Sequence, residues 1–295
     1  MAFLEILKVI FIGIIEGITE WLPISSTGHM LLVDQFIKLD ASQEFKDMFF
    51  VVIQFGAIMA VVYLYWKKLW PIHKTPNLRK LSKRRRENEL VMGKYSARKN
   101  VIVMWIMVIV ATIPAAIIGL LLDDWMDEYA HTPFVIAVAL IVYGVLFILV
   151  ENQIDGKEPE ITKLSQIDFK TALKLGGFQA LAIIPGTSRS GATIIGGLTI
   201  GVSRKLAAEF SFFMGIPVML GWSIVKMIKF GFSFTAFEVF ELLVGMIVAF
   251  VVSMFVIRYL IEYIKGNNFK IFGYYRIALG VLMIIVFSIK AIAGA

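Results

Sequence analysis

Two carboxylates, a histidine and four hydroxyls lie close together in the stretch 16–29, near the start of the chain. Glu16 and Glu20 are four residues apart, so on a helix they share one face and repel each other unless a cation or a shared proton relieves the repulsion. Carboxylate oxygens suit a hard cation such as Mg²⁺ or Ca²⁺, which also binds phosphate oxygens. The pair therefore predicts a divalent-cation site with Glu16 and Glu20 as its ligands.

The same stretch contains a candidate nucleophile and a candidate acid–base group. Ser26 and His29 are three residues apart at an expected helix start, within reach of a hydrogen bond that would activate the hydroxyl or protonate a leaving group. We expect Ser26, His29 and Glu20 to be catalytic. The attacking group stays open between Ser26, His29 and water; Ser26 assisted by His29 is favoured, because a hydroxyl at a helix start lies where an anion docks. Ser25 and Thr27 are expected to cap that helix and to contact the substrate.

A second polar stretch, Pro-Gly-Thr-Ser-Arg-Ser-Gly, occupies residues 185–191. Its glycines let the backbone approach a ligand, and the N–H groups of the following helix start favour an anion. Arg189 adds paired donors that match phosphate oxygens, so we expect it to bind substrate and to act in catalysis. The alternative is that Arg189 pairs structurally with Glu16 or Glu20. The expected substrate-binding residues are Gly186, Thr187, Ser188, Arg189 and Ser190.

The elements that carry these residues are apolar. The chain has 295 residues, is 59% hydrophobic and only 17% charged, and has a mean hydropathy of +0.81, which predicts a polytopic membrane protein. Twelve of its 29 Lys and Arg residues fall within 67–99. Basic clusters beside spanning helices mark the cytoplasmic side, so this segment predicts an inner loop and not a nucleic-acid partner.

Six stretches are long and apolar enough to span a bilayer, and two further apolar blocks, 3–32 and 171–200, are interrupted by Pro23 and Pro185. The six predicted spans are 48–66, 101–122, 133–150, 206–225, 237–257 and 271–289. Each half of the chain therefore contains one broken block and three spans. If each block is a re-entrant hairpin, an odd number of crossings inverts the second half relative to the first.

Placing Pro185 on Pro23 lays Thr187 and Ser188 over Ser25 and Ser26, which suggests an internal repeat. We expect an all-α, polytopic integral membrane protein: one membrane domain, 1–295, built from an inverted-topology repeat. The first repeat is 1–155 and the second 165–295. The two re-entrant hairpins should meet near the midplane and line a polar cavity. Both termini and the acidic segment 123–128 should lie outside.

The two motifs resemble the signature stretches of a known family. Glu16-Gly-Ile-Thr-Glu20, followed by Trp-Leu-Pro-Ile-Ser-Ser-Thr-Gly-His29, and later Pro185-Gly-Thr-Ser-Arg189-Ser-Gly-Ala-Thr193 are similar to those of bacterial undecaprenyl-diphosphate phosphatases of the bacitracin-resistance type. The resemblance covers the whole chain in length and segment order. It implies a divalent metal, undecaprenyl diphosphate as substrate, and a site in the bacterial plasma membrane that opens to the outer, periplasmic face.

The resemblance thus implies a hydrolase that recycles the lipid carrier of cell-wall synthesis and confers bacitracin resistance. A transporter or lipid flippase is the alternative, because inverted repeats with broken helices also build transporters. The residues favour the enzyme, since a transporter needs an anion clamp but not Ser26 and His29. The expected partners are a polyprenyl diphosphate and membrane lipids, with a homodimer left open.

Overall fold

Six helices are long and apolar enough to cross a membrane in the computed structural model, which describes residues 2–77, 81–231 and 233–293, without the side chains of 123, 124, 127 and 293. They are α3 (Gln43–Leu64), α6 (Lys99–Tyr129), α7 (Pro133–Gln153), α10 (Arg204–Phe230), α11 (Ala236–Tyr263) and α12 (Lys270–Ala293). Each includes most or all of one predicted span, as expected for segments near the 20 residues that a hydrocarbon core requires. The all-α polytopic fold is confirmed.

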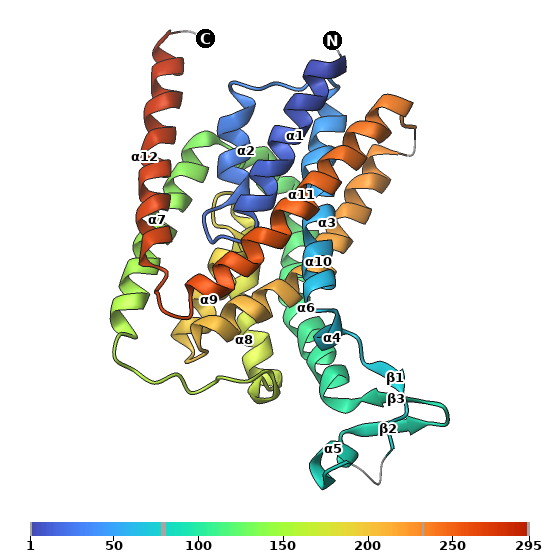
Figure 1. The fold of residues 1–295 in the computed structure, drawn as a ribbon. Coiled ribbons are helices and arrows are strands. Elements are labelled where there is room, and N and C mark those ends of the chain that lie inside the picture. Colours follow the sequence, from blue (N-terminus) through green and yellow to red (C-terminus); the bar gives the residue numbers. More distant parts are fainter. Residues whose placement is uncertain (1, 78–80, 232, 294–295) are drawn as a thin grey trace.

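Pairs of shorter helices occupy the two predicted broken blocks. The first pair is α1 (Ala2–Thr19) and α2 (Ser26–Asp34); the second is α8 (Phe169–Ala180), a 3-10 turn η3 (Leu181–Ile183) and α9 (Arg189–Thr199). Figure 1 shows α1 and α2 toward the end of the molecule where both termini lie, and α8 toward the opposite end. This arrangement agrees with hairpins that enter from opposite sides, and their re-entrant placement in a bilayer stays a prediction.

The same unusual serine cap starts the second helix of both pairs. Ser25 has a φ of +74° and accepts a hydrogen bond from the Gly28 N–H, and Ser188 has a φ of +71° and accepts one from the Gly191 N–H. Few residues other than glycine adopt this conformation, so its recurrence identifies Ser25 and Ser188 as equivalent. The predicted overlay of Ser188 on Ser26 is therefore wrong by one residue, because the second turn has one more residue between its proline and its cap.

The packing of the long helices is reciprocal between the two halves. α1 lies along α11 of the second half, and α8 lies along α6 of the first. α7 and α12 pack closely, since a Cβ on Gly144 would lie 2.7 Å from the Gly273 carbonyl oxygen. Exchanged partners of this kind are what an inverted repeat produces. The boundaries at 155 and 165 stay predictions.

The basic segment forms more structure than its composition indicates. It contains α4 (Trp66–Leu69), β1 (Ile72–Lys74), α5 (Lys83–Glu87), β2 (Glu89–Met92) and β3 (Tyr95–Arg98), and its antiparallel sheet has the order β1-β3-β2. Figure 1 shows this sheet at the end opposite the termini. A further 3-10 turn, η2 (Leu164–Gln166), precedes α8. The acidic segment 123–128 belongs to the last turns of α6; three of its side chains lie outside the described residues.

Candidate active site

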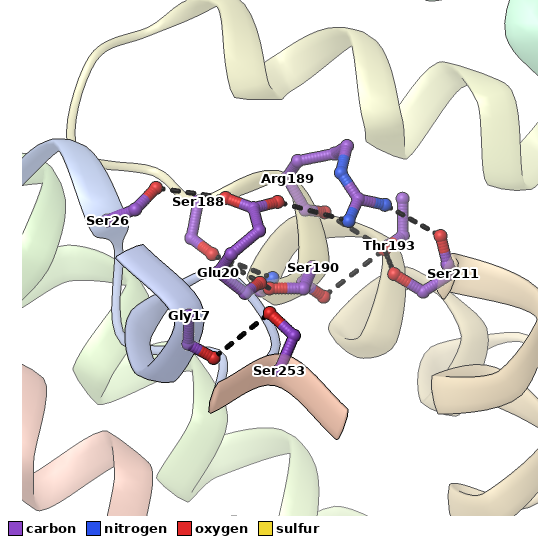
Figure 2. A network of polar contacts seen from close by, with 10 residues as sticks. Gly17, Glu20, Ser26, Ser188, Arg189, Ser190, Thr193, Ser211 and Ser253 are labelled. Carbon is purple, nitrogen blue, oxygen red and sulfur yellow. Dashed lines mark hydrogen bonds and ion pairs between the residues drawn. The ribbon is translucent and has the colours of Figure 1, made fainter. Parts of the chain in front are cut away.

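Side chains from the two turns meet inside the molecule (Figure 2). Ser26 Oγ, at the start of α2, donates a hydrogen bond of 3.0 Å to Glu20 Oε2. Arg189, at the start of α9, donates from a terminal nitrogen to Glu20 Oε1 at 3.2 Å. Glu20 therefore joins a hydroxyl of its own hairpin to a guanidinium of the other. The fold brings together three of the residues predicted to be catalytic.

The Arg189 guanidinium is held on two sides. Its second terminal nitrogen donates to the Ser211 carbonyl oxygen at 2.6 Å, and Gly215 of α10 lies directly against it. Its Nε is buried without a partner among the described residues. The structural pairing considered from the sequence, Arg189 with Glu20, is present, and Arg189 also borders a cavity. Its positive charge and its remaining N–H donors suit a phosphate oxygen.

Hydroxyl groups fix the start of α9 against the first turn. Ser190 Oγ donates to the Glu20 carbonyl oxygen at 3.1 Å, and its oxygen lies 3.1 Å from the Ser188 hydroxyl. Thr193 Oγ1 donates to Ser211 Oγ at 2.6 Å, which ties α9 to α10 (Figure 2). These contacts hold Arg189 and Glu20 in register. Ser211 was not expected from the sequence, where it is one serine in an apolar span.

Two adjoining cavities border this cluster. The first, of about 540 Å³, is called the termini-side cavity because it reaches Asp34 at the end of α2 and Asp47 in the second turn of α3. The second, of about 230 Å³, lies between the α8–α9 hairpin, α6 and α10 and is called the α6–α10 cavity. Ser26 and Gln54 line both cavities. A ligand at Ser26 therefore has access to two spaces of different character.

Glu16 borders the termini-side cavity and is almost fully buried, with 1% of its surface exposed. Its Oε1 has no hydrogen-bond partner among the described residues, whereas both oxygens of Glu20 are engaged. No group of three His, Cys, Asp or Glu side chains able to hold a metal occurs in the described part of the chain. Mg²⁺ is commonly held by one or two carboxylates together with substrate phosphates. The spare oxygen of Glu16 fits a cation shared with a phosphate, and not an all-protein cage.

His29 has partners other than the one expected. Its Nδ1 lies 2.7 Å from the Ser25 carbonyl oxygen and its Nε2 lies 2.7 Å from the Tyr275 hydroxyl, with the two rings stacked. Both ring nitrogens are thus occupied, and Ser26 bonds to Glu20 instead. The predicted Ser26–His29 hydrogen bond is not formed in the described structure. Glu20 is the group that can accept the Ser26 proton directly.

The remaining predicted residues divide by their surroundings. Thr27 lines both cavities, and Gly186 and Ser188 line the α6–α10 cavity. Ser25 is buried as a cap, as expected, and Thr187 is buried as well. Gly186 has a φ of +91°, and a Cβ there would lie 2.6 Å from the Ile136 carbonyl oxygen, so a glycine is required at this turn.

Arg276 of α12 is a site residue that sequence reasoning missed. Its side chain is fully buried and donates to the carbonyl oxygens of Pro23 at 3.1 Å, Gly186 at 2.8 Å and Thr187 at 2.9 Å. It therefore holds both turns by their backbones. An arginine inside a span is costly and marks function, so its position in the predicted span 271–289 was a usable signal.

The comparisons with known proteins identify a family for this chain. The family model described as "Bacitracin resistance protein BacA" matches residues 9–282. An undecaprenyl-diphosphatase of Enterococcus faecalis is 54% identical over 97% of this chain and 99% of its own length. One of Desulfitobacterium hafniense is 54% identical over the full length of both chains, and one of Acetivibrio thermocellus is 52% identical over 96% of this chain and 98% of its own. This chain belongs to the bacitracin resistance protein BacA family.

Proposed function

We propose that this chain is an integral membrane phosphatase that hydrolyses undecaprenyl diphosphate to undecaprenyl phosphate and inorganic phosphate. The observation that carries the proposal is the Ser26–Glu20–Arg189 contact, which places a hydroxyl, a proton acceptor and a phosphate-binding cation side by side beside a cavity. Its relatives of about 50% identity are named undecaprenyl-diphosphatases. Hydrolysis returns the lipid carrier for cell-wall synthesis, which fits the bacitracin resistance named in the family description.

The chemistry follows from the contacts. Arg189 and the N–H groups at the start of α9 bind the terminal phosphate, whose charge they stabilise as it shifts in the transition state. Ser26 Oγ attacks the terminal phosphorus, its proton passes to Glu20, and the bond from that phosphorus to the bridging oxygen breaks. Undecaprenyl phosphate leaves. Water then cleaves the phosphoserine, giving inorganic phosphate and restoring the Ser26 hydroxyl.

A direct attack by water is the alternative, with Glu20 as the base and Ser26 as a positioning group. His29 is a weaker candidate for the attacking group than its sequence position indicates, since both of its nitrogens are engaged. His29 instead supports the turn through Ser25 and Tyr275.

A divalent cation, Mg²⁺ or Ca²⁺, fits beside Glu16. The cation would supply charge neutralisation between a carboxylate-rich turn and a diphosphate. Glu16 is the residue with a buried oxygen to spare for it. Glu20 contributes through Ser26 and Arg189, and it would be a second ligand through a lone pair that these two contacts leave unused.

The proposed location is the bacterial plasma membrane, with the site open to the outer face through the termini-side cavity. One observation supports this: the sheet of the basic segment lies at the end opposite both termini (Figure 1), and basic segments beside spanning helices mark the inner side. The chain contains no native cysteine, so single cysteines report topology. A cysteine at Ala295 should react with an impermeant thiol reagent in intact cells and one at Ser82 should not; the reverse pattern would place the site inside.

Phosphate release from undecaprenyl diphosphate by the purified protein in detergent tests the proposed activity. Ser26→Ala and Glu20→Gln should each lower turnover by about 100-fold or more, the usual contribution of a positioned nucleophile or base. Ser253→Ala is the matched control, because this serine of the same region donates only a long 3.4 Å bond to the Gly17 carbonyl oxygen. A transporter or flippase would bind the lipid but release no phosphate, and that result would reject the proposed function.

A further inference from the structure

The two cavities beside Ser26 differ in chemical character. The termini-side cavity is lined by the charged side chains of Glu16, Asp34, Asp47 and Lys226, along with apolar residues such as Phe50. The charged side chains that line the α6–α10 cavity are Glu20 and Arg189, both part of the polar cluster described above, and the rest of its lining is uncharged and includes Gly119, Val218 and other small or apolar residues. The first space suits water, phosphate and a cation. The second suits hydrocarbon.

Beside the α6–α10 cavity, α6 and α10 contact each other in a different way from α3 and α11. α3 and α11 pack with their backbones in contact, since a Cβ on Gly56 would lie 2.6 Å from Met246 Cα. At Gly119, α6 meets α10 through a side chain instead: a Cβ there would lie 2.8 Å from a ring atom of Trp222. Trp222 lines both cavities, so its indole ring bridges the two helices beside the site.

The volume limits what the cavity can enclose. About 230 Å³ holds roughly seven groups the size of a water molecule. A long polyprenyl chain must therefore leave the cavity after its first units. The outer faces of both helices are apolar and exposed beyond it, for example at Ile117 and Leu121 on α6 and Ile224 on α10. A polyprenyl chain that leaves between these helices would contact an apolar surface that faces the lipid.

We propose that the α6–α10 cavity binds the first isoprene units of the substrate and that the polyprenyl tail leaves the protein between α6 and α10, past Gly119 and Trp222. The proposal rests on the proposed phosphatase function, because that function puts the diphosphate at Ser26 and Arg189. The tail is attached to the diphosphate and needs an apolar path that starts there. The termini-side cavity is left for water to enter and phosphate to leave.

Gly119→Leu tests the path by filling it. The added side chain cannot fit without displacing Trp222, so the KM for undecaprenyl diphosphate should rise about tenfold or more, with a smaller change in kcat. Gly221→Leu is the matched control: it adds the same side chain one residue from Trp222, where a Cβ would meet nothing within 4 Å, and should change KM less than twofold. If the leucine variant does not fold, Gly119→Ala adds a smaller side chain at the same position and should raise KM by less.

A photoreactive substrate locates the tail independently of kinetics. Farnesyl diphosphate with a diazirine on its terminal isoprene should label α6 and α10 of the otherwise unmodified protein, and Gly119→Leu should remove most of this label while Gly221→Leu retains it. Label confined to other helices, or an unchanged KM in a folded Gly119→Leu protein, would overturn the proposed path. If the unmodified protein releases phosphate in the same preparation, such a result rejects the path and leaves the phosphatase function standing.

Discussion

Replacing Gly215 by alanine should damage the active site without removing any polar group. The Arg189 guanidinium lies directly over this glycine: an added Cβ would sit 2.9 Å from Arg189 Cζ and 3.0 Å from each terminal nitrogen. Ordinary van der Waals contact begins near 3.4 Å, so the guanidinium must move by about 0.5 Å. That movement disturbs its bonds to Glu20 and to the Ser211 carbonyl oxygen together.

The magnitude follows from the cost of misplacement. An error of about 1 Å in a catalytic group costs about 100-fold, so about 0.5 Å should cost roughly tenfold in kcat/KM, or about 1.4 kcal/mol. The stability of α10 should increase, because alanine favours the interior of a helix over glycine by roughly 0.5–1 kcal/mol. Gly215→Ala should therefore lose activity while its helix propensity improves.

Phosphate release from undecaprenyl diphosphate gives kcat and KM, and a thermal melt of the detergent-solubilised protein reports folding. Gly221→Ala is the control, since it makes the same exchange six residues along α10 where no atom lies within 4 Å of the new Cβ. It should retain full activity. If Gly215→Ala retained the parental kcat/KM, the position of the Arg189 guanidinium would not limit catalysis and the reasoning would fail.

Three further changes separate the roles of the charged residues. Arg189→Lys keeps the charge but reaches only one of the two partners, so kcat/KM should fall about thirtyfold, matching the loss of about 2 kcal/mol for a charged hydrogen bond; near-parental rates would show that charge alone suffices. Glu16→Gln should raise the Mg²⁺ or Ca²⁺ concentration needed for half-maximal rate about tenfold; an unchanged titration after chelation and readdition of the metal would place the cation elsewhere. Arg276→Lys should leave at least one turn carbonyl unbonded and reduce turnover and substrate affinity together, with a lower melting temperature; a turnover loss without change in KM or melting would contradict a role in holding the turns.

The sequence by itself determined the membrane class, the six spans and the two motifs, because each follows from local composition. A stretch of about 20 apolar residues predicts a membrane span whatever the rest of the chain contains. The same is true of a proline followed by hydroxyls and of glycines around an arginine. Glu20, Ser26 and Arg189 were therefore found from residue type and spacing alone, before their contacts were known.

The partners of these side chains were decided only by the tertiary structure. Spacing placed Ser26 within reach of His29, yet Ser26 bonds to Glu20, because the turn folds back on the end of α1 while His29 turns to Tyr275 of α12. Arg276 holds two turns that precede it by 253 and about 90 residues, and no local pattern encodes such a contact. The one-residue shift between the two serine caps was also invisible, since a longer turn changes the register without changing the motif. The identity of a catalytic side chain can be predicted from the local sequence. Its contacts depend on which helices of the two halves pack together.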